Sequence, residues 1–229
     1  MLWLKCIYLK KGMIGVMKRL VTMLSVVALC IASLSTIASA NSKYTWPVPD
    51  STRITEGFKS STHKGIDIGA KKAGVAGDRI VAFYGGTVAR SGWSNSYGWV
   101  VYVHHVINSA NYQSRYAHMN KTPAVSSNQK VGKGATLGYM GKTGDATGVH
   151  LHFETRKCTG ACKTDNSSNP VNPITNFFPE HAGKVPKSIE LGETDPEHVN
   201  DLLDDIFYSV EEILNMTADE RLSKGIPLE

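Results

Sequence analysis

The sequence from Tyr44 to about Phe178 is divided into many short runs rich in Val, Tyr and Thr, separated by Gly, Asn and Ser. Runs of this length, bounded by turn residues, are typical of β-strands. No long helical period interrupts them. This part of the chain is therefore expected to fold mainly as an antiparallel β-sheet domain. The clearest expected strands are Arg79–Tyr84, Gly86–Arg90, Trp99–His104 and Ser114–Ala117.

Residues 1–40 have the layout of an export signal. Lys18 and Arg19 form a short basic region, and an apolar run continues from Leu20 to about Ile37. Ala38-Ser39-Ala40 then supplies a small-x-small cleavage pattern. The alternative is a membrane anchor, although the run is at the short edge of the roughly 20 residues that a spanning helix needs. We expect removal of this signal, no stable membrane span afterwards, and a protein that is secreted or located in the cell envelope.

Charge is distributed unevenly along the remaining chain. The full sequence has 25 Lys and Arg against 20 Asp and Glu, but five of the basic residues and none of the acidic ones lie in residues 1–40. The remainder is neutral, so the overall basic excess gives no reason to expect a nucleic-acid partner. Residues 41–184 carry 17 basic and 8 acidic side chains, and residues 185–229 carry 3 and 12. A body of net charge +9 is expected to be attracted to anionic polymers.

The acidic segment 185–229 is expected to be helical. Its apolar residues recur at spacings of three and four, with acidic residues between them, which is the pattern of an amphipathic helix. Asp195 can cap that helix, and Thr217 with Glu220 can form a capping box for a second short helix. The apolar positions are Val199, Leu202, Leu203, Ile206, Val210, Ile213 and Leu214.

Two of the four cysteines, Cys158 and Cys162, remain after removal of residues 1–40. In an exported protein, a pair this close is expected to form a disulfide that closes a small loop. The alternative is a pair of zinc ligands. No second pair of Cys or His at matching spacing lies nearby, which favours the disulfide.

Histidines and a carboxylate concentrate in three short segments. His63 and Asp67 are four residues apart, among glycines and β-branched residues that favour a loop running into a strand. His118 follows Tyr-Ala in the second segment. In the third, His150 and His152 are two residues apart in an expected strand, so both rings lie on one face of it.

This set of side chains fits a catalytic zinc site. Such sites usually have three His or carboxylate ligands and leave the fourth position to water. His63, Asp67 and one of the two histidines His150 and His152 would supply the ligands, while the other histidine and His118 would flank the open position for acid–base work. The remaining histidines are expected at the surface or in ordinary hydrogen bonds; they are His104, His105, His181 and His198.

The segments around these residues resemble the lysostaphin-type (LytM-like) zinc metallopeptidase domain. The matching stretches include His-Lys-Gly-Ile-Asp-Ile at 63–68, Tyr-Ala-His-Met at 116–119 and His-Leu-His-Phe-Glu at 150–154. The similarity extends over nearly all of the expected domain, residues 41–184. Further matching stretches are Ala-Phe-Tyr-Gly-Gly-Thr-Val at 82–88, Val-Gly-Lys-Gly at 131–134 and Gly-Lys-Thr-Gly at 141–144.

The resemblance implies a mainly antiparallel β fold with a substrate groove and one zinc ion per chain. It implies that His63, Asp67 and His152 bind the zinc and that His118 and His150 are catalytic. The implied activity is hydrolysis of peptide cross-links or stem peptides of bacterial peptidoglycan.

The sequence also departs from the family pattern. Phe58-Lys59-Ser60-Ser61 stands where the family often has Phe-Gly-x-Arg, and the segments Val106–Tyr112 and Cys158–Asn169 are longer than expected. These departures bear on the choice of substrate more than on the chemistry, because all five chemical positions are present.

Two alternative functions remain to be weighed. Some relatives of this domain lose ligands and act as non-catalytic wall-binding modules that regulate other wall hydrolases; here no ligand is lost. A D-alanyl-D-alanine dipeptidase would have a longer spacing than that from His63 to Asp67. The acidic tail could dock on the basic domain and mask its groove, or it could be an ordinary solvated helix.

Overall fold

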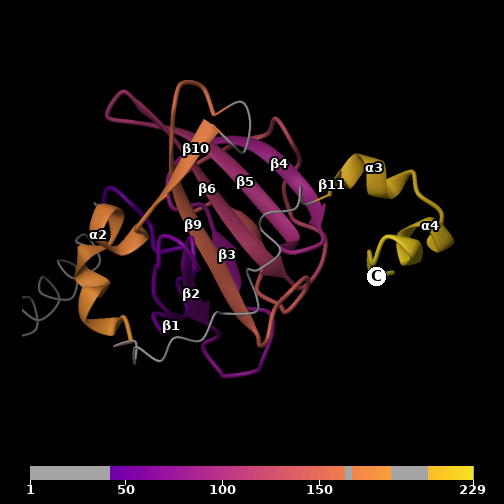
Figure 1. Ribbon diagram of the computed structural model, residues 1–229, viewed down its shortest axis with the longest axis horizontal. Helices are drawn as coiled ribbons and strands as arrows, with labels where there is room; N and C mark the ends of the chain where they lie inside the picture. Colours follow the sequence, from indigo (N-terminus) through magenta and orange to yellow (C-terminus); the bar gives the residue numbers. More distant parts are fainter. Residues whose placement is uncertain (1–41, 163–166, 187–205, 229) are drawn as a thin grey trace, which may run out of the picture. The chain divides into compact units, whose positions relative to one another are not determined.

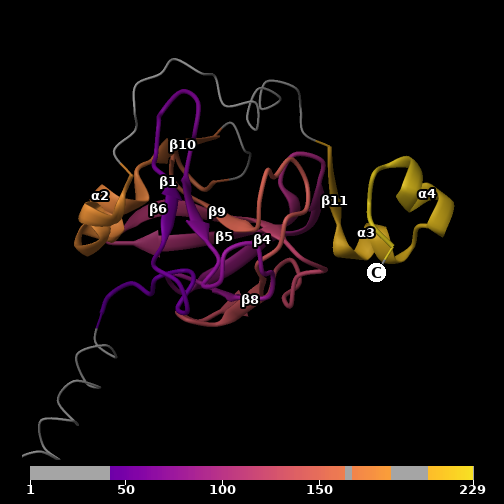
Figure 2. The ribbon, with the colours of Figure 1, turned by 90° about the horizontal axis from the view of Figure 1, so that it is seen from below.

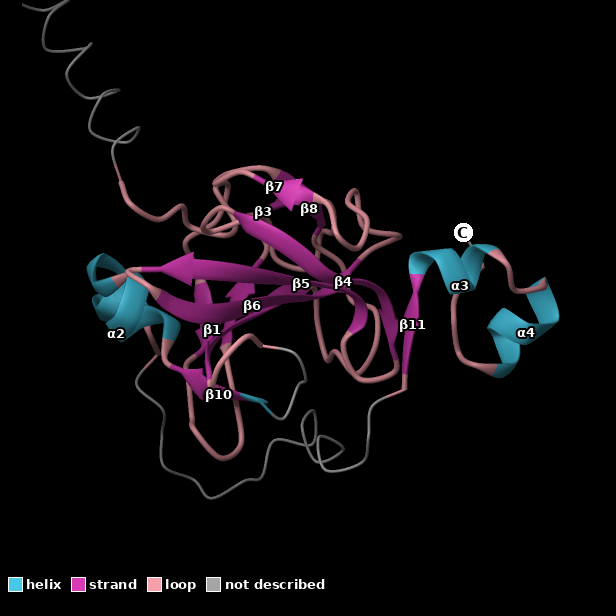
Figure 3. Ribbon diagram, turned by 90° about the horizontal axis from the view of Figure 1, so that it is seen from above, coloured by secondary structure: helices cyan, strands magenta, loops and turns pink. Residues whose placement is uncertain are grey.

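The computed structural model describes residues 42–162, 167–186 and 206–228. The expected export signal and the proposed cap Asp195 lie outside these residues. The described part from Tyr44 onward belongs to one compact unit, in which strands predominate and helices are short (Figure 3). This confirms the expected mainly antiparallel β fold. Within the described residues, no helix has the length and apolar character needed to cross a bilayer.

Nine strands form the main sheet, and its central strands lie side by side in Figure 1. The path through the sheet is β1-β2-β9-β6-β5-β4-β11, with β10 pairing with β9 and β7 with β4. Every pairing in this sheet is antiparallel. The bounds are β1 Ile54–Glu56, β2 Ile66–Gly69, β4 Gly86–Ser94, β5 Gly98–Ile107, β6 Ala110–Met119, β7 Lys130–Val131, β9 His150–Cys158, β10 Ser168–Val171 and β11 Phe207–Ser209.

A small second sheet covers one face of the main sheet. It consists of β3 (Arg79–Val81) and β8 (Thr136–Tyr139), and its apolar side chains belong to the same core as those of the main sheet. Figures 2 and 3 show it on the side away from β10. Helix α2 (Pro173–Phe177) and the 3-10 helix η2 (Pro179–Lys184) follow β10, and aromatic side chains of this region pack into the core.

The long strands match the expected ones in position and exceed them in length. β4, β5 and β6 each extend beyond the predicted runs because they continue into tight turns. Asn108 and Ser109, both with left-handed backbone at φ 50° and 63°, close the β5–β6 hairpin. Two successive residues of this kind are the mark of a two-residue hairpin turn. The segment Val106–Tyr112, which is longer than expected for the family, is thus the end of a long hairpin with a two-residue turn.

The expected helix of the acidic tail is confirmed over Val210–Leu214 but not over Phe207–Ser209. Residues 199–205 lie outside the described part, but Phe207–Ser209 form strand β11, and helix α3 begins only at Val210 and ends at Leu214. β11 pairs with the Gly92–Ser94 end of β4, which also pairs with β5 on its other side. Ser209 caps α3 with Glu212 in a capping box, which stops the helix from extending backwards. The box predicted for Thr217 and Glu220 is confirmed at helix α4, Ala218–Ser223.

Candidate metal centre and active site

Three side chains predicted to bind a metal meet at one point of the main sheet. His63 lies in the loop before β2, Asp67 lies on β2, and His152 lies opposite Asp67 on β9. Asp67 Oδ1 is 3.0 Å from His63 Nε2 and 2.9 Å from His152 Nδ1, and the two ring nitrogens are 3.2 Å apart. All three residues are almost completely buried. The alternation expected for β9 therefore holds.

These three atoms form a triangle of a size that suits zinc. Zinc in proteins is usually tetrahedral with His and carboxylate ligands at about 2.0–2.2 Å, which puts neighbouring ligand atoms about 3.3 Å apart. The observed separations of 2.9 to 3.2 Å are slightly shorter than this. Together these residues form a buried His-Asp-His group that can hold a metal ion.

The ring nitrogens of His63 and His152 that point away from the triangle are held in place. His63 Nδ1 donates a hydrogen bond to the carbonyl of Gly57 at 2.8 Å, and His152 Nε2 donates to Glu154 Oε1 at 3.3 Å. A carbonyl or carboxylate oxygen only accepts, so the proton lies on the nitrogen facing it. The opposite nitrogen of each ring faces Asp67 Oδ1, and without a proton it offers its lone pair to a metal.

Glu154 is the centre of a buried polar network beneath His152. Its carboxylate accepts hydrogen bonds from Tyr97 Oη at 2.5 Å and from Arg156 at 2.7 Å, and it lies 3.9 Å from the guanidinium of Arg115. Burial raises the pKa of Glu154, but Arg115, the His152 bond and Arg156 outweigh burial and hold this pKa well below its usual range. The carboxylate is therefore ionised and able to hold His152.

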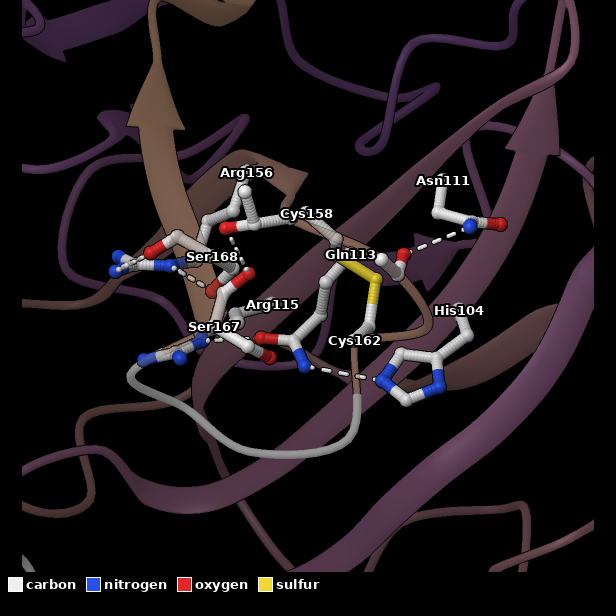
Figure 4. Close-up of a disulfide and its surroundings, with 11 residues drawn as sticks. His104, Asn111, Gln113, Arg115, Arg156, Cys158, Cys162, Ser167 and Ser168 are labelled. Atoms are coloured by element: carbon white, nitrogen blue, oxygen red, sulfur yellow. Dashed lines mark hydrogen bonds between the residues drawn. A yellow bond between two sulfur atoms is a disulfide. The ribbon is translucent and has the colours of Figure 1, made fainter.

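Arg156 connects this network to the hairpin that carries the disulfide (Figure 4). Its guanidinium donates to Ser168 Oγ at 2.9 Å and to the Ser168 carbonyl at 3.0 Å, on the neighbouring strand β10. Cys158, at the end of β9, is bonded to Cys162 with the Cα atoms 5.1 Å apart. The predicted disulfide is confirmed, and it closes a small loop where β9 ends.

His118 and His150 lie beside the ligand triangle and expose one nitrogen each to it. His118 Nδ1 donates to the Thr143 carbonyl at 2.7 Å, and His150 Nδ1 donates to the Gly148 carbonyl at 3.0 Å. The Nε2 atom of each ring is buried and has no hydrogen-bond partner among the described residues. His150 Nε2 lies 3.7 Å from Asp67 Oδ2, and the two rings are 4.8 Å apart.

The backbone of His118 is in the left-handed region, with φ 59° at the end of β6. A residue other than glycine seldom adopts this conformation, and such residues are common at functional sites. Here the conformation is held by hydrogen bonds from the His118 amide to the Tyr97 carbonyl and from the Gly141 amide to the His118 carbonyl. These bonds connect β6 to loops on both sides and fix the direction of the His118 ring.

The histidines of the site differ in pKa. Burial, together with the nearby His150 and His152, lowers the pKa of His118 to about 3, so this ring is neutral at physiological pH. Burial also acts to lower the pKa of His152, but hydrogen bonds to Asp67 and Glu154 raise it to about 10. Burial opposes ionisation of Asp67, yet the His152 and His63 bonds keep its pKa well below normal. A metal that binds Asp67 and His152 must displace the proton they share.

An open pocket of about 370 Å³ borders the site on the side of β1 and β2. It is large enough for part of a peptide chain, because ligand pockets begin at about 300 Å³. Asp67 and His150 form its inner wall. The other lining residues are Arg53, Thr55, Glu56, Gly74, Thr147, Gly148 and Val149.

The four remaining histidines have other environments. His105 is buried and bonded to the Gly85 carbonyl and to Ser114, and the ring of His181 stacks on Trp46. His104 is half-buried, near Gln113, as Figure 4 shows. His198 lies outside the described residues. His104 and His105 are hydrogen-bonded as expected, whereas His181 is buried and its Nδ1 has no hydrogen-bond partner among the described residues.

The sequence predicted all five proposed site residues, but it did not predict the residues that hold His152 in place. The alternation that places His150 and His152 on one face of β9 also places Glu154 there, so one support was within reach. Tyr97 and Arg115 come from other strands, and no local pattern connects them to Glu154. Arg53 was missed for the same reason, since it precedes β1.

Part of the chain is similar to a known family of peptidases. The family model described as "Peptidase family M23" matches residues 61–173. The chain is 30% identical over 117 residues to the DD-carboxypeptidase/endopeptidase Mpg of Neisseria meningitidis, and 35% identical over 92 residues to the peptidoglycan DD-endopeptidase ShyC of Vibrio cholerae. These alignments cover 51% and 40% of this chain, but only 23% and 19% of those relatives.

Solved structures with a similar fold include the antimicrobial peptidase lysostaphin from Staphylococcus simulans. It is 21% identical, with a TM-score of 0.49 over 68% of this chain and 63% of that chain. Csd3 from Helicobacter pylori is 28% identical, with a TM-score of 0.45 over 65% of this chain and 34% of that chain.

Proposed function

The chain carries a peptidase family M23 domain, and on that premise we propose that it is a zinc metalloendopeptidase that hydrolyses cross-links or stem peptides of bacterial peptidoglycan. The observation that carries the proposal is the combination at one site of a buried His63–Asp67–His152 triangle and two histidines, His118 and His150, whose Nε2 atoms have no hydrogen-bond partner within the described part of the chain. The first group fits the metal, and the second group fits proton transfer next to it.

When bound at the triangle, zinc supplies Lewis acidity that polarises a carbonyl and lowers the pKa of water. His118 and His150 are each held with the proton on Nδ1, which leaves the Nε2 lone pair directed into the site. A neutral ring of this kind takes a proton at Nε2 from the attacking water and can later give it to the departing amine. The lowered pKa of His118 keeps it in the form that accepts.

Glu154 and the Gly57 carbonyl have supporting roles in this proposal. They hold the rings of His152 and His63 so that the metal-facing nitrogens keep their direction. Holding ligands in this way normally strengthens metal binding. The network around His152 would therefore serve to hold the metal.

Peptidoglycan as substrate is supported by two independent features. The domain matches peptidase family M23, and its relative ShyC is a peptidoglycan DD-endopeptidase. The net charge of +9 on residues 41–184 is suited to an anionic cell wall. We further propose that the protein acts in the cell envelope or outside the cell, as the export signal expected in residues 1–40 suggests.

The test is digestion of purified peptidoglycan by the zinc-loaded protein, followed by mass spectrometry of the released peptides. New peptide termini are expected with wild type, whose identity names the bond that is cut, and they should be nearly absent with His150→Ala. His104→Ala, which alters a histidine outside the site, is the matched control and should remain active. One zinc per chain without new termini, on walls with direct or glycine cross-links, would instead favour the non-catalytic wall-binding module.

A further inference from the structure

Arg53 lies beside the metal centre without any role in holding it. It immediately precedes β1, and its carbonyl accepts a hydrogen bond from the amide of Gly69 on β2 at 2.8 Å. In the antiparallel pairing of β2 with β9, Asp67 is opposite His152 and Gly69 is opposite His150. Positions two apart on a strand share a face. Position 69 therefore lies on the same face as Asp67.

The guanidinium of Arg53 occupies the space that a side chain at position 69 would need. A Cβ at Gly69 would collide with Nη2 and Cζ of Arg53. The absence of a side chain at this position lets the guanidinium lie against the strand, next to His150 along the row of site residues. Arg53 also lines the pocket that Asp67 and His150 border. The charge is thus directed into the pocket within the reach of a bound peptide.

This guanidinium has no carboxylate partner among the described residues. Its hydrogen bond runs from Nη2 to the Ala70 carbonyl and is long, at 3.4 Å. The two acidic residues of the pocket are engaged elsewhere: Glu56 is bonded to Lys59 at 2.7 Å, and Asp67 belongs to the ligand triangle. Arginine carries a planar set of donors that matches a carboxylate in two parallel hydrogen bonds. Arg53 is therefore a cation available to a ligand.

We propose that Arg53 is a specificity-determining residue that binds a free carboxylate of the substrate peptide in the pocket beside His150. The inference rests on the proposed function and narrows its substrate class. Stem peptides of peptidoglycan carry free carboxylates at branched residues and at chain ends, whereas a bridge made only of glycine carries none within it. The pocket thus selects stem peptides with a carboxylate close to the scissile bond over uncharged bridges.

The test uses pairs of synthetic stem peptides that are identical except that one carboxylate is free or amidated. Wild type is expected to cleave the free form with kcat/KM about 10- to 100-fold higher, mainly through KM, as expected of one charge-assisted bond. Arg53→Gln should remove this preference, and Arg53→Lys should retain part of it. Arg79→Gln changes an exposed arginine on β3, outside the pocket, and should leave the preference intact.

Two outcomes would overturn the proposal. One is that wild type cuts both peptides equally well. The other is that Arg53→Gln slows both to the same extent, with a lower melting temperature, which would show that Arg53 only supports β1 and β2. Calorimetric binding of the same peptides to zinc-loaded His118→Ala protein, with and without Arg53→Gln, measures the carboxylate preference without cleavage. If wild type cleaves neither peptide but binding of the free-carboxylate peptide depends on Arg53, the proposed function is contradicted and the role of Arg53 is supported.

Discussion

The two faces of strand β9 contain residues of opposite character. His150, His152, Glu154 and Arg156 alternate with Leu151 and Phe153 along one short stretch. The first group faces the metal centre and its support, whereas Leu151 and Phe153 are completely buried in the apolar core. Alternate residues of β9 therefore supply the site and the apolar core. A shift of one residue in the pairing of β9 would exchange the two faces.

The polar face is also buried, and this has a consequence. Unpaired polar groups in such a place would be costly, yet Glu154 is bonded to Tyr97, Arg156 and His152. Close to this face, the Nε2 atoms of His118 and His150 have no hydrogen-bond partner among the described residues. Under the proposed function, the polar groups that support the metal have their hydrogen bonds within the protein. The two ring nitrogens that would face the substrate do not. The following predictions test that division, in order of decreasing effect.

His118→Ala should lower kcat by about 10²- to 10⁴-fold, the usual contribution of a general acid or base. Zinc content should remain at one per chain, because His118 is not part of the triangle. Steady-state kinetics together with metal analysis check this. Loss of zinc along with activity would show that His118 belongs to the ligand set.

Phe153→Ala should destabilise the fold by about 3–5 kcal/mol, the usual cost of removing a buried aromatic ring. Its ring packs against those of Tyr116 and Phe83 at 5.2 and 5.8 Å. Urea denaturation measures the change. The zinc bound by each folded chain should not change, and Phe153→Leu should cost less. A stable variant that has lost zinc would contradict the division between the faces.

His105 should make the fold sensitive to acid. Burial lowers its pKa to about 4, against an opposing effect of the bond to the Gly85 carbonyl. Because the folded pKa is below the unfolded value of about 6.5, the unfolded chain binds the proton more readily. The contribution of neutral His105 to the stability of the fold is therefore fully present above pH 6.5 and is lost as the pH falls towards 4. The largest loss is about 3 kcal/mol.

The measurement for His105 is denaturation of wild type and His105→Gln at pH 7 and pH 4.5. Wild type should lose more stability on acidification than the variant, because other groups titrate equally in both. Equal losses would show that His105 is protonated in the fold without penalty. The ring lies on the core side against Phe83, with centroids 4.8 Å apart, so cleavage chemistry is not expected to depend on it directly.

Glu154→Gln should weaken zinc binding by about 10- to 100-fold, as is usual when the carboxylate behind a ligand histidine is lost. Competition with a chelator measures the affinity. Glu56→Gln is the matched control, since this carboxylate lines the pocket but is bonded to Lys59 and not to a ligand. Unchanged affinity in Glu154→Gln would mean that the bond to His152 has no influence on the metal.

Much of the site could be predicted because its residues occur in short local patterns. Strand alternation alone placed His150 and His152 on one face and Leu151 and Phe153 on the other. The surroundings of Glu154 could not be predicted in the same way, because Tyr97 and Arg115 reach it from other strands. Likewise, nothing local indicates that Arg53 lies against Gly69.

The acidic tail shows the limit of periodicity. Residues Phe207–Ser209 fit a helical pattern, but they pair with β4 as a strand. The free edge of a sheet offers backbone hydrogen bonds that a local pattern does not take into account. On the other hand, the capping box at Thr217 and Glu220 depends on residues three apart, and it was predicted correctly. The sequence predicted the local capping box, but it did not predict the pairing of two strands that are far apart in the chain.

The most direct measurement compares two adjacent residues of β9, His152→Asn and Leu151→Ala. Zinc content is measured in each variant, together with the thermal stability of the metal-free chains. We expect His152→Asn to lose zinc while its metal-free chain still folds, and Leu151→Ala to keep its zinc while unfolding at a clearly lower temperature. If both variants lose zinc and stability together, the division of metal binding and stability between the two faces of β9 is wrong.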